Sequence, residues 1–158
     1  MQCCARWMPG MMTDNSIALR VAATLAFEEL GLLCVGSAID TPSALETLPA
    51  VVSVAFDGAH TGCLTLRVSD DVFRALAENM LGLDGDDAEP WRWDALGEMA
   101  NVICGNALPY ILGTHACLTL APPARGAPPA SRSASHVELE VEAGRARILL
   151  ELAELRRQ

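Results

Sequence analysis

Asp94, Glu98 and Asn101 are spaced so that a helix would place their side chains in one narrow polar stripe. Gly105 extends this stripe by one more turn. The two carboxylates attract cationic groups, and the carboxamide accepts a hydrogen bond without adding negative charge. Such a set can present acidic groups and a neutral hydrogen-bonding group to another surface. The alternative interpretation of the stripe alone is a solvated polar helix face.

Two glycines, Gly97 and Gly105, lie one turn before and one turn after Asn101. A glycine inside a helix costs about 1 kcal/mol relative to alanine, so the pair implies a local requirement. Because neither neighbour has a Cβ atom, we expect the Asn101 amide to stand clear, where another surface can approach it closely. Glycines placed for helix packing are the alternative.

The helix that carries the stripe is predicted to run from Pro90 to Gly113. Proline suits a first turn because its missing N–H has no partner there, and glycine suits a C-terminal end. Pro109 is expected to kink the last turns, because it removes a hydrogen bond to the carbonyl of Gly105. The side opposite the stripe is apolar and is expected to face the core: Leu96, Met99, Ile103, Ala107, Tyr110 and Ile111.

The whole chain has 158 residues, a net charge of −9 and no lysine. This length suits one domain with a sizeable core, and we expect residues 13–158 to form it after a disordered extension over residues 1–12. The negative charge argues against nonspecific binding to nucleic acid or to anionic membranes. The apolar stretch over residues 17–39 is interrupted by charges and is too broken to span a membrane.

The six cysteines show no C-x-x-C pair, and the three histidines have no ligand spacing, so a zinc site is not expected. Cys34, Cys63, Cys104 and Cys117 lie among apolar residues and are expected to be small buried hydrophobes. This interpretation is preferred to a reactive thiol for Cys104, which neighbours the stripe. A reducing cytoplasm is the simplest setting for such a chain.

Hydrophobic periodicity and turn residues predict a helix, three strands, a second helix, the long helix and three more strands. Short connections, such as Asp57-Gly58, favour hairpins and therefore a largely antiparallel sheet. The predicted fold class is α+β, with two layers and the helices on one face of the sheet. The segment at 123–135 is rich in Pro, Ala and Ser and is expected to be a mobile loop. The predicted helices before the long one cover residues 16–32 and 70–81, and the strands cover residues 33–39, 50–56, 61–68, 115–122, 136–141 and 145–152.

The pattern Asp94-x-x-x-Glu98-x-x-Asn101, followed after 21 residues by Pro123, resembles the active-site motif of the CheC/CheX/FliY chemotaxis phosphatases. In that family the first position is Ser or Asp and the last is Pro or Ser. The sequence ALGEMANVICGNA is similar to the equivalent helix of CheX, as is the predicted order of elements. CheC proteins carry two such motifs. Here Glu28 is followed three residues later by Gly31, so the single motif resembles the CheX arrangement.

The resemblance implies a phosphatase whose substrate is the phosphoaspartate of a CheY-like response regulator. In that family Asn101 would orient the attacking water, and Glu98 would pair with a lysine of the regulator. Asp94, Gly97, Gly105 and Pro123 would shape or support the site. The resemblance also implies a homodimer joined through its sheets, and Mg²⁺ that is supplied by the regulator rather than by this chain.

Two other hypotheses stay open at this point. The second hypothesis is a CheX-like module that binds a regulator or another signalling partner without turnover, because retained residues do not guarantee a productive geometry. The third is an unrelated α+β interaction domain whose stripe is accidental. For pairing between subunits, the candidate strands are the one near residues 114–121 and the last hairpin.

Overall fold

The computed structural model describes residues 14–39, 44, 47–83, 88–129 and 134–153. Within this part of the chain, the helical elements are α1 (Asp14–Leu25), the π-helix η1 (Ala26–Leu30), α2 (Asp70–Leu81) and α3 (Glu89–Leu112). The strands are β1 (Val35–Ala38), β2 (Ala50–Gly58), β3 (Gly62–Val68), β4 (Leu118–Leu120), β5 (Ala124–Arg125), β6 (Ala134–Val141) and β7 (Gly144–Leu152). The predicted order is confirmed, with β5 as an addition. The expected N-terminal extension, residues 1–12, lies outside the described residues.

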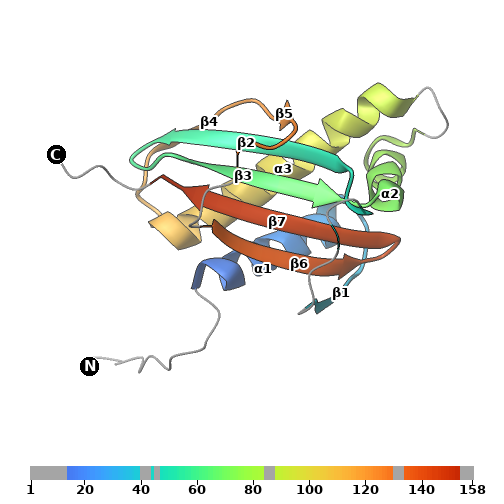
Figure 1. The fold of residues 1–158 in the computed structure, drawn as a ribbon, viewed down its shortest axis with the longest axis horizontal. Coiled ribbons are helices and arrows are strands. Elements are labelled where there is room, and N and C mark those ends of the chain that lie inside the picture. Colours follow the sequence, from blue (N-terminus) through green and yellow to red (C-terminus); the bar gives the residue numbers. More distant parts are fainter. Residues whose placement is uncertain (1–13, 40–43, 45–46, 84–87, 130–133, 154–158) are drawn as a thin grey trace.

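The described strands form one sheet in the order β1-β6-β7-β3-β2-β4, with β5 also paired to β2 (Figure 1). Every one of these pairs is antiparallel. The hairpin predicted around Asp57-Gly58 is present, because β2 and β3 pair from Ala50↔Val68 to Phe56↔Gly62. The last hairpin, β6–β7, lies inside the sheet between β1 and β3. It therefore offers no edge of the described sheet for pairing between subunits, whereas β4 does.

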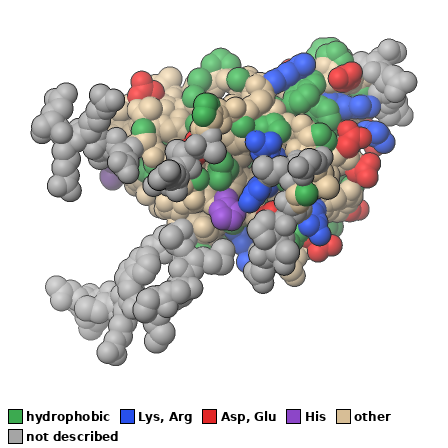
Figure 2. Space-filling model, viewed as in Figure 1, with side chains coloured by type: hydrophobic (Ala, Val, Ile, Leu, Met, Phe, Trp, Pro, Cys, Tyr) green, Lys and Arg blue, Asp and Glu red, His purple; other side chains and the backbone are tan. Residues whose placement is uncertain are grey.

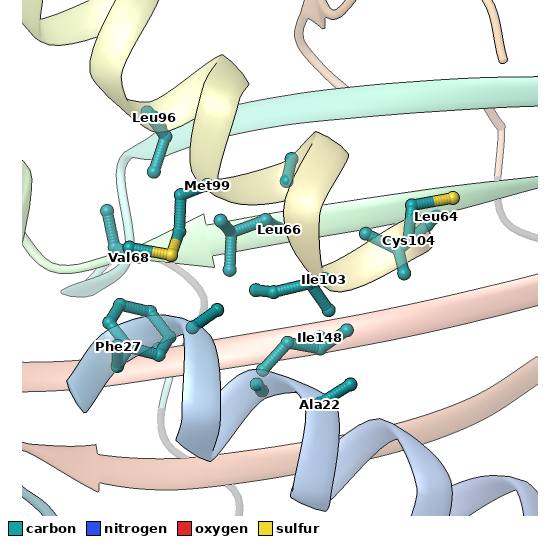
Figure 3. Close-up of a cluster of buried hydrophobic side chains, with 14 of the residues drawn as sticks. Ala22, Phe27, Leu64, Leu66, Val68, Leu96, Met99, Ile103, Cys104 and Ile148 are labelled. Atoms are coloured by element: carbon teal, nitrogen blue, oxygen red, sulfur yellow. The ribbon is translucent and has the colours of Figure 1, made fainter. Parts of the chain in front are cut away.

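The α-helices lie together on one face of the sheet, which confirms the two-layer α+β architecture (Figure 1). α3 packs on β2 and β3 and contacts both α1 and α2. The core fills the space between the layers, where Leu66 of β3 and Ile148 of β7 meet Met99 of α3 and Phe27 of η1 (Figure 3). Complete burial of one such side chain stabilises the fold by about 1.5–3 kcal/mol. None of the described helices is long and apolar enough to cross a membrane.

Ser69 precedes α2, as expected of a capping residue, but its hydroxyl has another partner. Within the described residues it makes no capping hydrogen bond to the helix. Its Oγ accepts a hydrogen bond from the backbone N–H of Arg145 (3.1 Å), and its own N–H donates to the Arg145 carbonyl (3.0 Å). The serine therefore joins the start of α2 to the start of β7.

The sheet face opposite the helices contains a buried acidic side chain on β6. Glu138 has only 5% of its surface exposed. Its Oε1 lies 4.0 Å from Nη1 of Arg145, and Arg147 is its cross-strand neighbour. Figure 2 shows this face, on which arginine and acidic side chains lie among apolar ones. A buried carboxylate requires such cationic neighbours, and these come from strand pairing that the local pattern does not reveal.

Candidate functional site

α3 carries the predicted stripe, and its orientation is fixed by what it buries. Leu96, Met99 and Ile103 are fully buried against the sheet, so the helix cannot rotate without exposing them (Figure 3). The predicted ends are correct within one residue, with a proline in the first turn and Gly113 (φ 94°) at the C-terminal end. The helix continues through Pro109 to Leu112.

Asp94 and Glu98 lie one turn apart on the solvent side of α3, and both are exposed. Neither forms an ion pair with another described residue. Two adjacent unpaired carboxylates repel each other weakly in solvent and attract a cation strongly when a partner excludes water between them. The structure therefore presents both acids to an approaching molecule, as the spacing predicted.

Asn101 lies one turn beyond Gly97 and is half-buried rather than fully clear. Its carbonyl oxygen, Oδ1, is buried and has no hydrogen-bond partner among the described residues. The expectation that this amide stands clear is therefore wrong for the oxygen atom. A buried acceptor without a partner costs about 1–3 kcal/mol. Since χ2 of asparagine is broad and roughly two-fold, a rotation of the amide can offer this oxygen to a water molecule.

Pro123 explains the first of the two glycines. A Cβ atom built on Gly97 would lie 3.0 Å from Cβ and 3.3 Å from Cγ of Pro123, which is closer than ordinary van der Waals contact. The surface that approaches Gly97 therefore belongs to this chain and not to a partner. The structure brings together Pro123 and the helical stripe, which are far apart in the sequence.

A β-bulge directs Pro123 toward the helix. Leu120 pairs with Phe56, and Ala124 pairs with Ser53, so four steps on one strand face three steps on the other. The extra residue falls in the Pro122-Pro123 pair, where no backbone N–H is available for the sheet. Bulges of this kind bend a strand locally and redirect a side chain. We call residues 121–126, which include this bulge and β5, the strap segment.

The strap segment makes a second contact with α3 through Arg125. Its guanidinium carbon lies 4.6 Å from the centroid of the Trp93 ring. Trp93 in turn packs against Phe73 of α2, with ring centroids 4.8 Å apart and an interplanar angle of 60°. One stack thus joins α2, α3 and β5. The prediction of a mobile loop at 123–135 is wrong where β5 forms and at its last two residues, which begin β6, whereas residues 130–133 lie outside the described residues.

Trp93 and Arg125 have no place in the sequence-based prediction of the site. Trp93 directly precedes Asp94, so its position on the helix was visible, but its exposure was not. Arg125 lies in a segment whose composition resembles a loop. Its pairing with Val52 of β2 depends on residues more than seventy positions apart, which no local pattern encodes.

Gly105, the second glycine, faces open space. No described atom lies within 4 Å of a Cβ atom built there. The expectation of room for a close approach is thus met one turn beyond Asn101, and the stripe is confined on one side and open at its end.

Tyr110 is 83% exposed, so its predicted position in the core is wrong. It lines an apolar groove of about 670 Å³ between α1 and α3, together with Val21, Leu25, Val102 and Asn106. Val102, Asn106 and Tyr110 lie on the side of α3 that faces α1. The groove separates the two helices there, so this side of α3 is not filled by α1. Ala107 and Ile103, on the row facing the sheet, are buried as predicted.

Cys104 adjoins the stripe and is fully buried. Burial, together with the negative charge of a neighbouring Cys63 thiolate, raises the pKa of its thiol from 9.0 to about 12. The thiolate is therefore negligible at neutral pH, which agrees with an inert structural thiol. Cys34 and Cys117 are exposed, contrary to expectation, because they lie at the ends of strand-connecting segments.

The described residues contain no group of three or more His, Cys, Asp or Glu side chains that could hold a metal ion. Asp94 and Glu98 alone provide two carboxylates on a convex helix surface, which is too few ligands for Mg²⁺. What this arrangement can do is present a neutral amide beside two acids, on a rigid helix, to the surface of another molecule.

Comparisons with known proteins identify the family and the fold. The profile of a family described as chemotaxis phosphatase CheX matches residues 50–152. No curated protein sequence is significantly similar to the chain. The crystal structure of a chemotaxis protein CheX from Desulfovibrio desulfuricans superposes with a TM-score of 0.70 at 16% identity, covering 89% of this chain and 100% of that chain. CheX from Vibrio vulnificus superposes with a TM-score of 0.71 at 13% identity, covering 89% and 97%. A CheX–CheY–BeF3–Mg²⁺ complex from Borrelia burgdorferi gives 0.63 at 13%, covering 87% and 97%. At such identities these superpositions show a shared fold.

Proposed function

Because the chain belongs to the CheX family of chemotaxis phosphatases, we propose that it hydrolyses the phosphoaspartate of a CheY-like response regulator. The Borrelia burgdorferi structure contains CheX together with CheY, which supports a regulator of that class as the partner. The observation that carries the proposal is that an exposed Glu98 lies one turn of α3 from the Asn101 carbonyl, which is buried and has no hydrogen-bond partner among the described residues. Family membership also argues against an accidental stripe.

Asn101 orients the attacking water in this proposal. The new bond forms between the water oxygen and phosphorus, and the bond between phosphorus and the aspartyl oxygen breaks. Inorganic phosphate and a free aspartate are released. The acyl phosphate is already activated, so positioning is the main task of the protein. The amide oxygen accepts a proton of the water without adding negative charge near the phosphoryl oxygens. In doing so it gains a hydrogen bond that none of the described residues supplies.

Glu98 docks the regulator. A carboxylate beside a phosphoryl group is unfavourable unless a cation lies between them, so we propose that a lysine of the regulator pairs with Glu98. Asp94, one turn earlier, strengthens the same negative field. Gly97 and Pro123 support the site through their mutual contact. Mg²⁺ comes with the regulator, in keeping with the presence of Mg²⁺ in the Borrelia burgdorferi complex.

The oligomeric state and the location follow as parts of this proposal. We propose a homodimer joined through its sheets at β4, a strand at the edge of the described sheet. We also propose a reducing cytoplasm as its location, because the four described cysteines are all free thiols.

The proposal is tested by following inorganic phosphate release from a phosphorylated CheY-like regulator, with and without the protein. We expect the lifetime of the phosphoaspartate to shorten in proportion to the protein concentration. Binding without a shorter lifetime would support the alternative function, a non-catalytic module that docks the regulator. If neither binding nor a shorter lifetime is observed with any candidate regulator, the proposal is wrong.

Gly105→Ala gives a prediction in which stability and activity move in opposite directions. The free protein should gain up to about 1 kcal/mol, because alanine favours the helix and the added methyl group meets open space. The KM for the phosphorylated regulator should rise, because the methyl group stands on the docking side, one turn from Asn101. Thermal unfolding and a phosphate-release titration measure the two effects. An unchanged KM would place the docked regulator away from this turn.

A further inference from the structure

We propose that Arg125 and Trp93 hold the strap segment against α3, and that the strap segment sets the orientation of the Asn101 amide. Arg125 and Trp93 would then be positioning residues for the proposed phosphatase reaction. This inference rests on the proposed function for its kinetic consequence. Its structural consequence, the orientation of the amide, can be measured without turnover.

The spacing of the two contacts matches the geometry of the two elements. Trp93, Gly97 and Asn101 lie one turn apart on the same row of α3, with a rise of about 6 Å between neighbours. Two residues of an extended strand advance by about 6.6 Å. The two steps are nearly equal, so the strap segment can run antiparallel to α3, with Arg125 over Trp93 and Pro123 on Gly97. On the other side of the bulge, Leu120 pairs with the buried Phe56 and so returns to the sheet face that α3 covers.

The strap segment is anchored to the sheet at both ends. The N–H of Ala121 donates a hydrogen bond to the Ala55 carbonyl (2.8 Å), and the N–H of Gly126 donates to the Val51 carbonyl (2.9 Å). Between these anchors lies the bulge with its two prolines, which have no backbone N–H to donate to the sheet. Their position therefore depends on contact with the helix, and Arg125 supplies that contact outside the bulge. Phe73 of α2 also packs against the Trp93 ring.

The burial of the Asn101 carbonyl is consistent with this arrangement. Asn101 is half-buried and continues the row of Trp93 and Gly97, the two residues that contact the strap segment. Its Oδ1 is buried, although Gly105 one turn further on is open. Among the described elements, the strap segment contacts this row of α3 at Trp93 and Gly97, and the row becomes open only at Gly105. Moving this segment would change the environment of Oδ1 without altering the core beneath α3.

The test compares Arg125→Ala with Arg125→Lys and with Gly97→Ala. Arg125→Ala removes the cation over Trp93, whereas Arg125→Lys keeps one. Gly97→Ala displaces Pro123 directly, because the added methyl group would lie 3.0 Å from its Cβ. We expect kcat for phosphate release to fall about tenfold in Arg125→Ala and in Gly97→Ala, with KM changed less than about twofold, because a small misplacement of a positioning group affects the chemical step. Arg125→Lys should recover most of kcat.

A second readout is the ¹H–¹⁵N resonance of the Asn101 side-chain amide, assigned by its loss in Asn101→Ala. It should shift in Arg125→Ala and Gly97→Ala, and remain near its original position in Arg125→Lys. The matched control is Arg74→Ala, which removes an exposed arginine paired with Asp70 on α2 and should change neither readout.

The two proposals fail separately. If the Asn101 resonance and kcat are both unchanged in Arg125→Ala and Gly97→Ala, the positioning role is wrong, while an inactive Asn101→Ala still supports the phosphatase. If the parent protein shows no phosphatase activity, the proposed function is wrong, and the resonance alone decides whether the strap segment orients the amide. A fall in kcat that Arg125→Lys does not restore, without a shift of the resonance, would also overturn the inference.

Discussion

Asn101→Ala should reduce kcat for phosphoaspartate hydrolysis by about a hundredfold or more while leaving the fold intact. Losing one preorganised hydrogen-bonding group at a reaction centre commonly costs this much. Stability should stay the same or increase, because alanine is the better helix former and the substitution removes a buried acceptor that has no partner among the described residues. Phosphate release and thermal unfolding measure the two effects. Most inactivating substitutions lower stability, so opposite signs would identify a site residue rather than a structural one.

The same helix offers two matched comparisons for this experiment. Asn106→Ala removes the same side chain from an exposed position five residues further on, at the groove beside α1, and should keep kcat. Asn101→Asp keeps the shape of the side chain but adds a negative charge beside the phosphoryl group, so it should be as inactive as Asn101→Ala. Full activity in Asn101→Ala would exclude the proposed role. Full activity in Asn101→Asp would show that neutrality of the group is unimportant.

Glu98→Lys should reduce kcat/KM by about a hundredfold through binding. The parent carboxylate is exposed and is proposed to pair with a lysine of the regulator, so the substitution sets two positive charges opposite each other. Like-charge contacts across an interface cost several kcal/mol, and each 1.4 kcal/mol corresponds to a factor of ten. Glu98→Gln, which is neutral, should show a smaller loss. Binding of the phosphorylated regulator, measured at several salt concentrations, reports the effect.

The control for this prediction is Glu78→Lys, which makes the same change in net charge at an exposed position of α2. It should leave kcat/KM within about twofold, because a distant surface charge is largely screened. Affinity of the parent protein should fall as salt increases, and that of Glu98→Gln should fall less steeply. Equal losses in Glu98→Lys and Glu78→Lys would mean that net charge, and not docking at this helix, controls binding.

The groups of the proposed site differ in the parts of the structure that hold them in place. The acids of the stripe lie free on the surface and depend only on the helix that carries them. Asn101 depends in addition on the strap segment, which is placed by a two-residue strand and by one arginine–tryptophan contact. We therefore expect docking to survive changes in the strap segment that reduce turnover. Changes in the strap segment should therefore impair the proposed role of Asn101 in turnover and leave the proposed docking role of Glu98 intact.

Local sequence determined the elements and the stripe. The ends of α3 were predictable from Pro90 and Gly113, and its buried side from apolar residues at helical spacing, because both depend on neighbours within a few turns. The hairpin at Asp57-Gly58 was predictable for the same reason. The positions of Asp94 and Glu98 on the solvent side followed once the buried side was known. These features, with the spacing to Pro123, were sufficient to predict the family and the fold.

Tertiary structure alone decided what surrounds the stripe. The contact of Pro123 with Gly97, the stack of Arg125 on Trp93 and the burial of the Asn101 carbonyl all join segments that are distant in the chain. Tyr110 was misplaced because helical periodicity identifies a row but not whether a neighbouring helix fills the space beside it. Strand register and the distance between packed helices result from the whole core, so a local pattern can place a side chain on a face but not determine its neighbours.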